Sequence, residues 1–260
     1  MVLELEPRWA PASAHPVLAV EEVHVWRIGL DWPGRPLEEL AAILSADELA
    51  KATRFHFRRD RERFIVARGV LRVLLARYIG REPASLRFRA GPAGKPTLAT
   101  QSCRGGLRFN MSHSDGLALY AMSRGREVGV DLERILPGVI EEEIAERFFS
   151  PREVVELCAL PKGLQVEAFF RCYTRKEAYL KARGEGLSIP LNQFSVSLAH
   201  RAPAALLSSD GDAGEVLNWS LQELAPGPGY MAALAVEGKE WHVKLWRWPD
   251  FEGQGLSPQG

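Results

Sequence analysis

The sequence has 260 residues, 46% hydrophobic and 25% charged, which is ordinary for a soluble globular protein. Its 33 basic and 33 acidic residues leave no formal net charge, so a global basic field for nucleic acid is absent. The three cysteines form no Cys-x-x-Cys pair, and neither a signal pattern nor an apolar run of membrane length is present. We therefore expect a cytoplasmic protein with reduced cysteines that binds neither membranes nor nucleic acids.

The first part of the chain is expected to hold one long helix among several strands. Ser45 and Glu48 have the spacing of a capping box, which predicts the start of a helix. Apolar residues at helical spacing predict a long helix from Arg61 to Ile79, and a loop is predicted from Gly91 to Pro96. A turn at Ser114-Asp115-Gly116 joins two alternating segments into a hairpin. The predicted strands span residues 23–28, 107–112 and 117–122.

The second part of the chain loosely repeats this order. A long helix is predicted over residues 167–182, ended near Gly184. Shorter helices are predicted over 140–149 and 151–160, and strands over 127–133, 194–198, 216–221, 231–236 and 242–246. Such a mixture indicates an α+β fold with antiparallel sheets packed on helices. We expect an N-terminal half over residues 1–125, a C-terminal half over 126–250 and a flexible tail over 251–260.

Two short clusters of acidic residues indicate the chemistry. The segment from Gly129 to Glu133 alternates apolar and acidic residues, so Asp131 and Glu133 point to the same face of a strand. Their repulsion is relieved by a hard cation such as Mg²⁺, which takes oxygen ligands. The segment from Lys176 to Lys181 adds Glu177 between two lysines. Three carboxylates with nearby lysines suit metal-assisted phosphoryl transfer.

Each of these acids also has an ordinary structural interpretation. Asp131 and Glu133 can form the solvated face of an edge strand, and Glu177 can form an exposed ion pair with Lys181 one helical turn later. Apolar neighbours on the same helix, Tyr173 among them, favour a partly buried Glu177 that needs a partner. A metal ion would supply that partner.

Basic and polar residues elsewhere are candidates for holding phosphate. His113 follows Ser112 at the mouth of the predicted hairpin, where it is either structural or a phosphate ligand. Gly94-Lys95-Pro96 is a tight turn that presents one lysine. The segment after Lys51 carries many arginines, of which most are expected to be solvated while one or two could clamp a phosphate. These are Arg54, Arg58, Arg59, Arg61, Arg63, Arg68 and Arg72.

Taken in order, these motifs resemble those of the 4′-phosphopantetheinyl transferases of the surfactin-synthetase-activating type. That family has Gly-Ile/Val-Asp-x-Glu, matched by residues 129–133, and Phe-x-x-x-Trp-x-x-Lys-Glu-Ala/Ser-x-x-Lys, matched by 169–181. The family's Gly-Lys-Pro, Phe-Asn-Ile/Val-Ser-His-Ser and Gly-x-Gly-Leu are matched by residues 94–96, 109–114 and 184–187. The match runs from about Ser45 to Val236. Tyr173 replaces the usual tryptophan, and we expect no loss of activity because both rings can pack.

The resemblance implies a fold and an activity. The fold would be two similar α/β halves in a pseudo-twofold arrangement, with one active site at their junction. The activity would be transfer of the 4′-phosphopantetheine arm of coenzyme A to a serine of an apo acyl or peptidyl carrier protein. The by-product would be adenosine 3′,5′-bisphosphate. Because one chain holds both halves, we expect an active monomer, and the sequence does not indicate which carrier or pathway it serves.

The resemblance also implies the catalytic residues. Asp131, Glu133 and Glu177 would hold Mg²⁺, with Mn²⁺ as an alternative. Glu177 or a metal-bound water would accept the proton of the carrier serine. Lys176 and Lys181 would contact the pyrophosphate of coenzyme A, so Glu177, Lys176 and Asp131 are the residues expected to act in catalysis.

The remaining implied contacts belong to the nucleotide and the carrier. His113, with Ser112 beside it, would contact the 3′-phosphate of coenzyme A. Further residues that align with the nucleotide site are Lys51, Arg63, Lys95 and Pro96. The carrier would dock near residues 135–149, where Ile140, Ile144 and Phe148 recur at helical spacing and form either core or docking surface.

Two other classes of function stay open on the residues alone. A metal-dependent nucleotide phosphodiesterase could use the same acids, and hydrolysis of coenzyme A without an acceptor would favour it. A non-catalytic nucleotide-binding protein is the second, and the intact acids and lysines argue against it.

Overall fold

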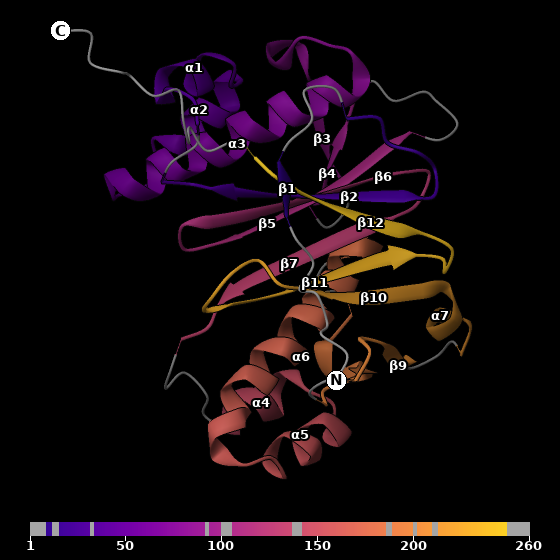
Figure 1. Cartoon of the computed structure of the whole chain (residues 1–260). Coiled ribbons are helices and arrows are strands. Elements are labelled where there is room, and N and C mark those ends of the chain that lie inside the picture. The colour runs from indigo at the N-terminus through magenta and orange to yellow at the C-terminus, as the bar shows by residue number, and fades with distance from the viewer. Residues whose placement is uncertain are drawn as a thin grey trace, which may run out of the picture.

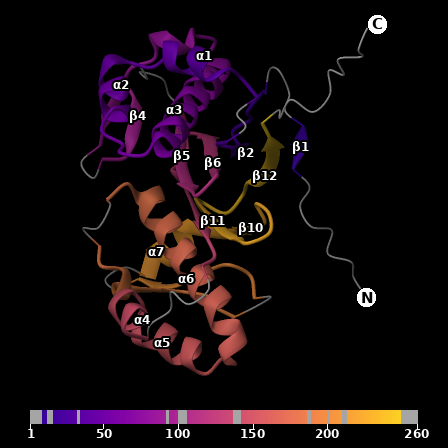
Figure 2. The same ribbon diagram turned by 90° about the vertical axis from the view of Figure 1, so that its left-hand side faces the viewer.

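The described residues of the computed structural model form two larger sheets, packed face to face, with a group of helices on the outer face of each, and two short two-stranded sheets (Figure 1 and Figure 2). The structure describes residues 9–11, 16–31, 34–91, 94–99, 106–136, 142–185, 189–199, 202–209 and 213–248. In these ranges, none of the helices combines the length and the apolar character needed to cross a membrane.

The N-terminal half packs its helices on a five-stranded sheet. The strand order is β1-β12-β2-β6-β5, in which β12 runs parallel to β2, and the β2–β6 and β6–β5 pairs are antiparallel. Helix α3 buries Leu71 and Leu74 in one apolar cluster with Trp26 and Tyr120 of the sheet. The elements are β1 (Ala10–Pro11), β2 (Glu22–Gly29), α1 (Leu37–Ala42), α2 (Ala46–Ala52), α3 (Arg58–Ile79), η1 (Pro83–Ser85), β3 (Phe88–Ala90), β4 (Pro96–Leu98), β5 (Leu107–Ser114), β6 (Leu117–Arg124) and β12 (His242–Arg247).

The C-terminal half packs its helices on a three-stranded antiparallel sheet of order β10-β11-β7. Helix α6 places Phe169 and Tyr179 in one apolar cluster with Ala233 of β11 and Phe194 of β8. The elements are β7 (Val128–Arg134), α4 (Glu142–Phe148), α5 (Pro151–Cys158), α6 (Lys162–Arg183), η3 (Leu191–Gln193), β8 (Phe194–Val196), β9 (Leu206–Ser209), α7 (Ala213–Asn218), β10 (Trp219–Leu224) and β11 (Tyr230–Glu237).

Strands β5 and β7 meet where the two halves join. The side-chain oxygen of Asn110 accepts a hydrogen bond from the backbone N–H of Val130 at 2.9 Å. Ser114 Oγ accepts one from the backbone N–H of Arg134 at 3.0 Å. Because polar side chains of β5 bind the backbone of β7, residues near the end of each strand are held side by side.

Gly129 lets helix α6 approach strand β7 closely. A Cβ at this position would collide with the backbone oxygen of Ala178 and the backbone nitrogen of Ala182. Only glycine therefore fits here without a shift of the helix. The close approach brings the acidic face of β7, with Asp131 and Glu133, next to the face of α6 that carries Glu177.

The two halves share a local design. Ser45 and Glu48 form a complete capping box at the start of α2, and Ser150 and Glu153 form another at the start of α5. A 22-residue helix comes after each of these short helices, α3 in the first half and α6 in the second. Both long helices end at a glycine in the left-handed region. This recurrence supports the expected likeness of the halves within a mixed α+β fold.

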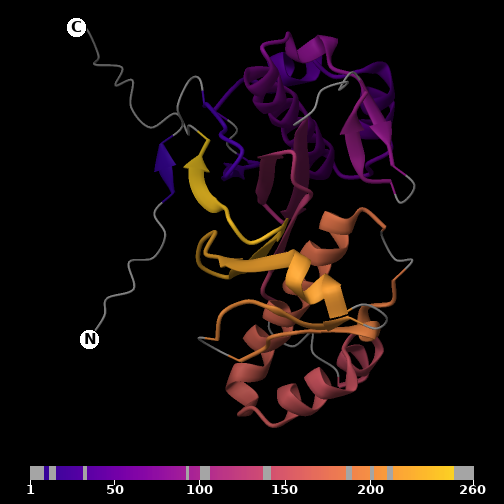
Figure 3. The same cartoon turned by 90° about the vertical axis from the view of Figure 1, so that its right-hand side faces the viewer.

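Most of the predicted helices and strands are confirmed, and the structure differs from the prediction in three respects. Residues 216–218 were predicted as strand but belong to α7, and the strand begins at Trp219. The segment 242–247, assigned to the C-terminal half, crosses back as β12 into the N-terminal sheet beside β1 and β2 (Figure 3). Short elements without clear periodicity were missed: β1, α1, β3, β4 and β9. The predicted tail over 251–260 lies outside the described residues.

Candidate active site at the junction of the two halves

A cavity of about 520 Å³ opens where α2, α3, the β3–β4 turn, β5 and α6 come together. It brings together several of the sequence-predicted site residues and Arg68, which none of the family motifs contains. The lining includes Lys51, Arg68, Pro96, Ser112, His113 and Lys181. The wall also carries the acids Asp47 and Glu48, so its basic groups are in slight excess, which suits an anionic ligand.

Asp131 is the most deeply buried of the three predicted acids, with 2% of its surface exposed. Its Oδ1 accepts hydrogen bonds from Lys181 Nζ at 2.5 Å and from Ser112 Oγ at 3.0 Å. Its Oδ2 is buried and has no hydrogen-bond partner among the described residues. A buried carboxylate oxygen without a partner is costly, so this atom is suited to a further ligand.

Glu133 and Glu177 are half-buried and lie within the electrostatic reach of Asp131. Burial raises the pKa of Glu133, and Asp131 raises it further, while Ser114 donates a hydrogen bond to Glu133 Oε2 at 3.1 Å. Burial also raises the pKa of Glu177, again with a contribution from Asp131 and an opposing one from Lys181. The three acids therefore repel one another, as the alternation on β7 predicts.

Tyr173 lies one helical turn before Glu177 and is close to the same acids. Its ring stacks on Phe169 with centroids 6.2 Å apart and an interplanar angle of 4°. Burial, followed by Glu177 and the two β7 acids, raises the pKa of Tyr173 to about 12. The residue that replaces the family's tryptophan thus keeps an aromatic contact and adds a neutral hydroxyl beside the acids.

The acids fit a hard metal ion in kind, although they are not assembled around one. In the described part of the chain, no three His, Cys, Asp or Glu side chains are placed to hold a metal ion. Lys181 instead supplies the positive charge beside Asp131. The donor set is made of carboxylate oxygens, and the orphaned Oδ2 of Asp131 offers a ligand atom, so an oxygen-preferring cation such as Mg²⁺ fits these residues.

His113 lies on the cavity wall in a positive environment. Desolvation lowers the pKa of His113, and the charges of Lys181, Arg63 and Lys51 lower it further. These three cations surround a histidine that has an anion-binding role in the sequence-based hypothesis. Lys51 is exposed, and its ammonium lies 5.7 Å from the ring centroid of Phe64.

Lys176 is not at the cavity, which corrects the role expected from the sequence. The side chain is fully buried and forms an ion pair with Glu153 at 2.7 Å. Its ammonium also donates to the backbone oxygens of Leu191 at 2.7 Å and Phe194 at 2.5 Å. With three acceptors and no exposed surface, this lysine joins α6 to α5 and β8 and is not placed to contact a pyrophosphate.

Two further predicted nucleotide contacts are engaged with protein groups. Lys95 Nζ donates to Glu127 at 3.0 Å and to the backbone oxygens of Val128 and Ala182 at 3.2 and 2.8 Å. It therefore ties the β3–β4 turn to β7 and α6, while its neighbour Pro96 faces the cavity. Arg63 binds Asp31 and Asp115, each at 2.8 Å, and acts on the cavity through its charge.

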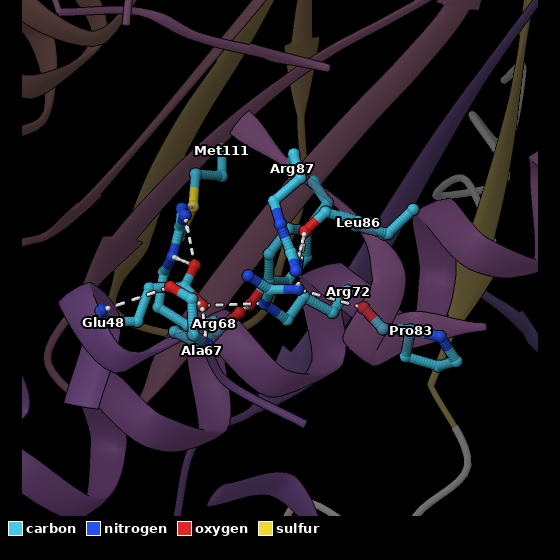
Figure 4. A network of polar contacts seen from close by, with 10 residues as sticks. Glu48, Ala67, Arg68, Arg72, Pro83, Leu86, Arg87 and Met111 are labelled. Carbon is cyan, nitrogen blue, oxygen red and sulfur yellow. Dashed lines mark hydrogen bonds and ion pairs between the residues drawn. The ribbon is translucent and has the colours of Figure 1, made fainter. Parts of the chain in front are cut away.

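A largely buried network in the wall of the cavity was not predicted. Glu48 accepts hydrogen bonds from both Arg68 and Arg72 of α3 (Figure 4). Arg72 is 1% exposed, so the expectation of a solvated arginine is wrong at this position. The capping box and the arginines one turn apart are visible in the sequence, but their pairing across 20 and 24 residues is not.

Comparison with known proteins decides the family. A model of the 4′-phosphopantetheinyl transferase superfamily matches residues 127–235, and a model of the N-terminal region of 4′-phosphopantetheinyl transferase matches residues 33–124. The 4′-phosphopantetheinyl transferase HetI of Nostoc sp. is 43% identical over 94% of this chain and 100% of its own length. The chain belongs to the 4′-phosphopantetheinyl transferase family.

Other relatives in this family are more distant. The 4′-phosphopantetheinyl transferase Sfp of Bacillus subtilis is 32% identical over 62% of this chain and 69% of its own length. Among solved structures, the holo-[acyl-carrier-protein] synthase of Thermotoga maritima overlaps 44% of this chain and 63% of its own, with 22% identity and a TM-score of 0.35.

Proposed function

We propose that this 4′-phosphopantetheinyl transferase moves the 4′-phosphopantetheine arm of coenzyme A to a serine of an apo acyl or peptidyl carrier protein. The serine Oγ attacks the phosphorus that bears the pantetheine arm. The bond from that phosphorus to the oxygen shared with the adenosine-bearing phosphate breaks. The products are the holo-carrier and adenosine 3′,5′-bisphosphate, and the serine proton goes to a base.

The observation that carries this proposal is that three acids of the chain lie together where its two halves meet. Asp131, Glu133 and Glu177 lie at the junction, next to a cationic cavity large enough for part of a nucleotide. These acids would hold Mg²⁺ or Mn²⁺, which when bound neutralises charge on the pyrophosphate. The unpartnered Oδ2 of Asp131 supports a ligand at this position.

Residues of the chain itself would position the reactants and move the proton. Lys181 lies between Asp131 and the cavity, so its ammonium can contact the pyrophosphate of coenzyme A. Glu177 is the proposed acceptor of the serine proton, because its half-buried carboxylate lies beside Asp131 at the junction. Ser112 and His113, with Lys51 and Pro96 on the wall, would hold the nucleotide end.

The carrier would dock near residues 135–149. Ile144 and Phe148 are partly buried and pack against the core of the C-terminal half, and Phe148 lies edge-on to Tyr173 at 6.2 Å. Ile140 lies outside the described residues. This packing shows that both side chains contribute to the core, so the docking proposal rests on the position of the segment beside Tyr173 and the acids. We further propose that the chain acts as a monomer, since both halves of the site come from one chain. We also propose that it acts in the cytoplasm, as the cysteine pattern indicates.

Intact-mass spectrometry of candidate apo-carriers tests the proposed function. The chain, coenzyme A and Mg²⁺ should together add the mass of phosphopantetheine to the acceptor serine. A serine-to-alanine carrier is the matched control and should gain nothing. Undiminished transfer in excess chelator would contradict the metal requirement, and hydrolysis of coenzyme A without any carrier would favour a phosphodiesterase instead.

A further inference from the structure

Side chains, rather than a backbone ladder, join strands β5 and β7, which belong to different sheets. Asn110, Ser112 and Ser114 occupy alternate positions of β5, so they share one face of that strand. Each of the three forms a hydrogen bond with β7. Because β5 belongs to the N-terminal half and two of the acids lie on β7, the first half of the chain can hold acids of the second half in place.

Ser114 makes two contacts with β7 through one oxygen atom. Its Oγ accepts a hydrogen bond from the backbone N–H of Arg134 at 3.0 Å. The same hydroxyl donates to Oε2 of Glu133 at 3.1 Å. A carboxylate oxygen can only accept, so the hydrogen of the hydroxyl is committed to Glu133 while a lone pair takes the N–H of Arg134. The orientation of the hydroxyl is therefore fixed, and Oε2 of Glu133 is held in turn.

The two acids of β7 are held in the same way by serines of β5. Asp131 is bonded at Oδ1 by Ser112, and its Oδ2 has no partner among the described residues. Glu133 is bonded at Oε2 by Ser114, and this is the one hydrogen bond that the described residues give to its carboxylate. Each acid thus has one oxygen fixed and the other available, as in a metal ligand that is oriented by a hydrogen-bonded neighbour.

The turn that follows Ser114 is anchored to the N-terminal half. Asp115 and Gly116 join β5 to β6, and Asp115 has a φ of 49°, in the left-handed region that residues other than glycine adopt at a cost. Arg63 of α3 donates from Nη1 to Oδ1 of Asp115 at 2.8 Å. This ion pair stabilises the turn in the conformation in which Ser114 reaches β7.

Arg63 is itself fixed by a second carboxylate. Its Nε and Nη2 donate to the two oxygens of Asp31, each at 2.8 Å, and its side chain is 12% exposed. A Cβ at Gly116 would lie 2.9 Å from Oδ2 of Asp31 and 3.0 Å from Nη2 of Arg63, so glycine allows this ion pair to pack against the turn. The guanidinium of Arg63 therefore supports the turn from the side of α3, and the backbone of Ser114 is held beside β7.

We propose that Ser114 is a positioning residue for the divalent cation: its hydroxyl holds one oxygen of Glu133, so that the other oxygen is available as a ligand. This inference rests on the proposed function, because it takes Glu133 as a ligand of Mg²⁺ or Mn²⁺. Loss of a hydrogen-bonded partner of a ligating side chain typically weakens metal binding by about ten- to a hundredfold. The N-terminal half therefore contributes to the metal site through Ser114, although the acids belong to the C-terminal half.

The test is the affinity for Mn²⁺, measured by electron paramagnetic resonance on the chain saturated with coenzyme A, with no carrier present and hence no transfer. Ser114→Thr and Ser114→Val are nearly equal in shape and differ in the hydroxyl. The valine variant should bind Mn²⁺ about ten- to a hundredfold more weakly than the unaltered chain, and the threonine variant should stay within about threefold.

Ser220→Ala is the matched control. It removes a serine hydroxyl of β10 that donates to the backbone oxygen of Gly238, and it should leave the affinity for Mn²⁺ unchanged. Calorimetry without metal adds a second readout, because Ser114→Val should bind coenzyme A within about twofold of the unaltered chain. A merely structural role of Ser114 would weaken both ligands together.

Equal affinities of the valine and threonine variants for Mn²⁺ would overturn the proposal, whether both are normal or both are weakened. If Ser114→Val does not fold, Ser114→Ala takes its place, since alanine adds no branch to the side chain, and the same selective loss of Mn²⁺ is expected. Failure of the proposed function is distinguishable, because the unaltered chain would then add no mass to any apo-carrier. Failure of this inference alone leaves transfer by the unaltered chain intact.

Discussion

Helices α3 and α6 hold matching places in the two halves but contribute different chemistry to the junction between them. Each is 22 residues long, and each pairs a buried cation with the glutamate of a capping box. Toward the junction, α3 presents Arg68 to the cavity, whereas α6 presents Glu177 and Lys181. Arg72 and Lys176 belong to the common structural frame, whereas neighbouring side chains of the same helices face the junction.

Breaking the buried pair of α6 should have the largest effect on stability. Lys176→Met leaves the charge of Glu153 buried without its cation, so we expect a loss of about 3–5 kcal/mol in the free energy of unfolding. Arg68→Gln should lose less, about 1.5–3 kcal/mol at most, because Glu48 keeps Arg72. Urea denaturation followed by circular dichroism compares the two. Equal losses of stability would show that Glu48 depends on Arg68 as strongly as Glu153 depends on Lys176.

Removal of the central acid should have the largest effect on transfer. Asp131→Asn keeps the shape but loses the charge that faces Lys181, and we expect turnover to fall by about a hundred- to a thousandfold. Asp47→Asn is the control, because Asp47 is an exposed acid on the same cavity and should leave turnover within about twofold. A normal rate in Asp131→Asn, measured by carrier mass, would show that transfer does not need the negative charge of Asp131.

His113→Ala should sharpen the assignment of the nucleotide end. We expect coenzyme A to bind about ten- to a hundredfold more weakly, with little change for 3′-dephospho-coenzyme A. Calorimetry with each of the two ligands shows whether His113 contacts the 3′-phosphate. A loss shared equally between the ligands would assign His113 to another part of the site.

Protonation of His113 should accompany binding. In the ligand-free chain its pKa lies below the ordinary 6.5, first because of desolvation and then because of three cations. A bound phosphate raises the pKa of His113 again. At a pH between the pKa of the free chain and that of the complex, the complex therefore holds more protons, and binding takes up a fraction of a proton. Calorimetry in two buffers of different ionisation enthalpy measures this uptake. His113→Gln should reduce it, and unchanged uptake would assign the proton elsewhere.

The smallest effect is expected at Tyr173. Tyr173→Trp restores the aromatic residue usual in the family and can keep the stack on Phe169, so turnover should change by less than about threefold. Carrier-mass assays measure this directly. A tenfold change would mean that the phenol hydroxyl beside the acids takes part in the reaction.

How far the sequence predicts the site depends on how local each signal is. The alternation around Asp131 and the capping box at Ser45 are local patterns that the sequence predicts, and the structure contains both. The placement of Lys176 is not local, because its partners lie on α5, η3 and β8 and become neighbours only on folding. Lys176 is next to Glu177 in sequence but points to another face of the helix, where burial and pairing determine its role.

The fold shows the same limit. Periodicity predicts the long helices, but it does not place β12, which returns to the first sheet beside β2. Nor does it reveal that Arg68 and Arg72 meet Glu48, since an arginine-rich helix is normally solvated. The shared frame of the two halves becomes visible only when both glutamate–cation pairs are compared in space.

The central claim is that the N-terminal half binds the nucleotide while the C-terminal half supplies the acids for transfer. Its most direct test is steady-state transfer to one apo-carrier, with the concentration of coenzyme A varied, for His113→Ala and Asp131→Asn. We predict that His113→Ala raises the KM for coenzyme A by about ten- to a hundredfold and leaves kcat nearly unchanged. Asp131→Asn should instead lower kcat by about a hundredfold or more. If both variants changed the same parameter by the same factor, the two halves would not divide nucleotide binding and catalysis as described.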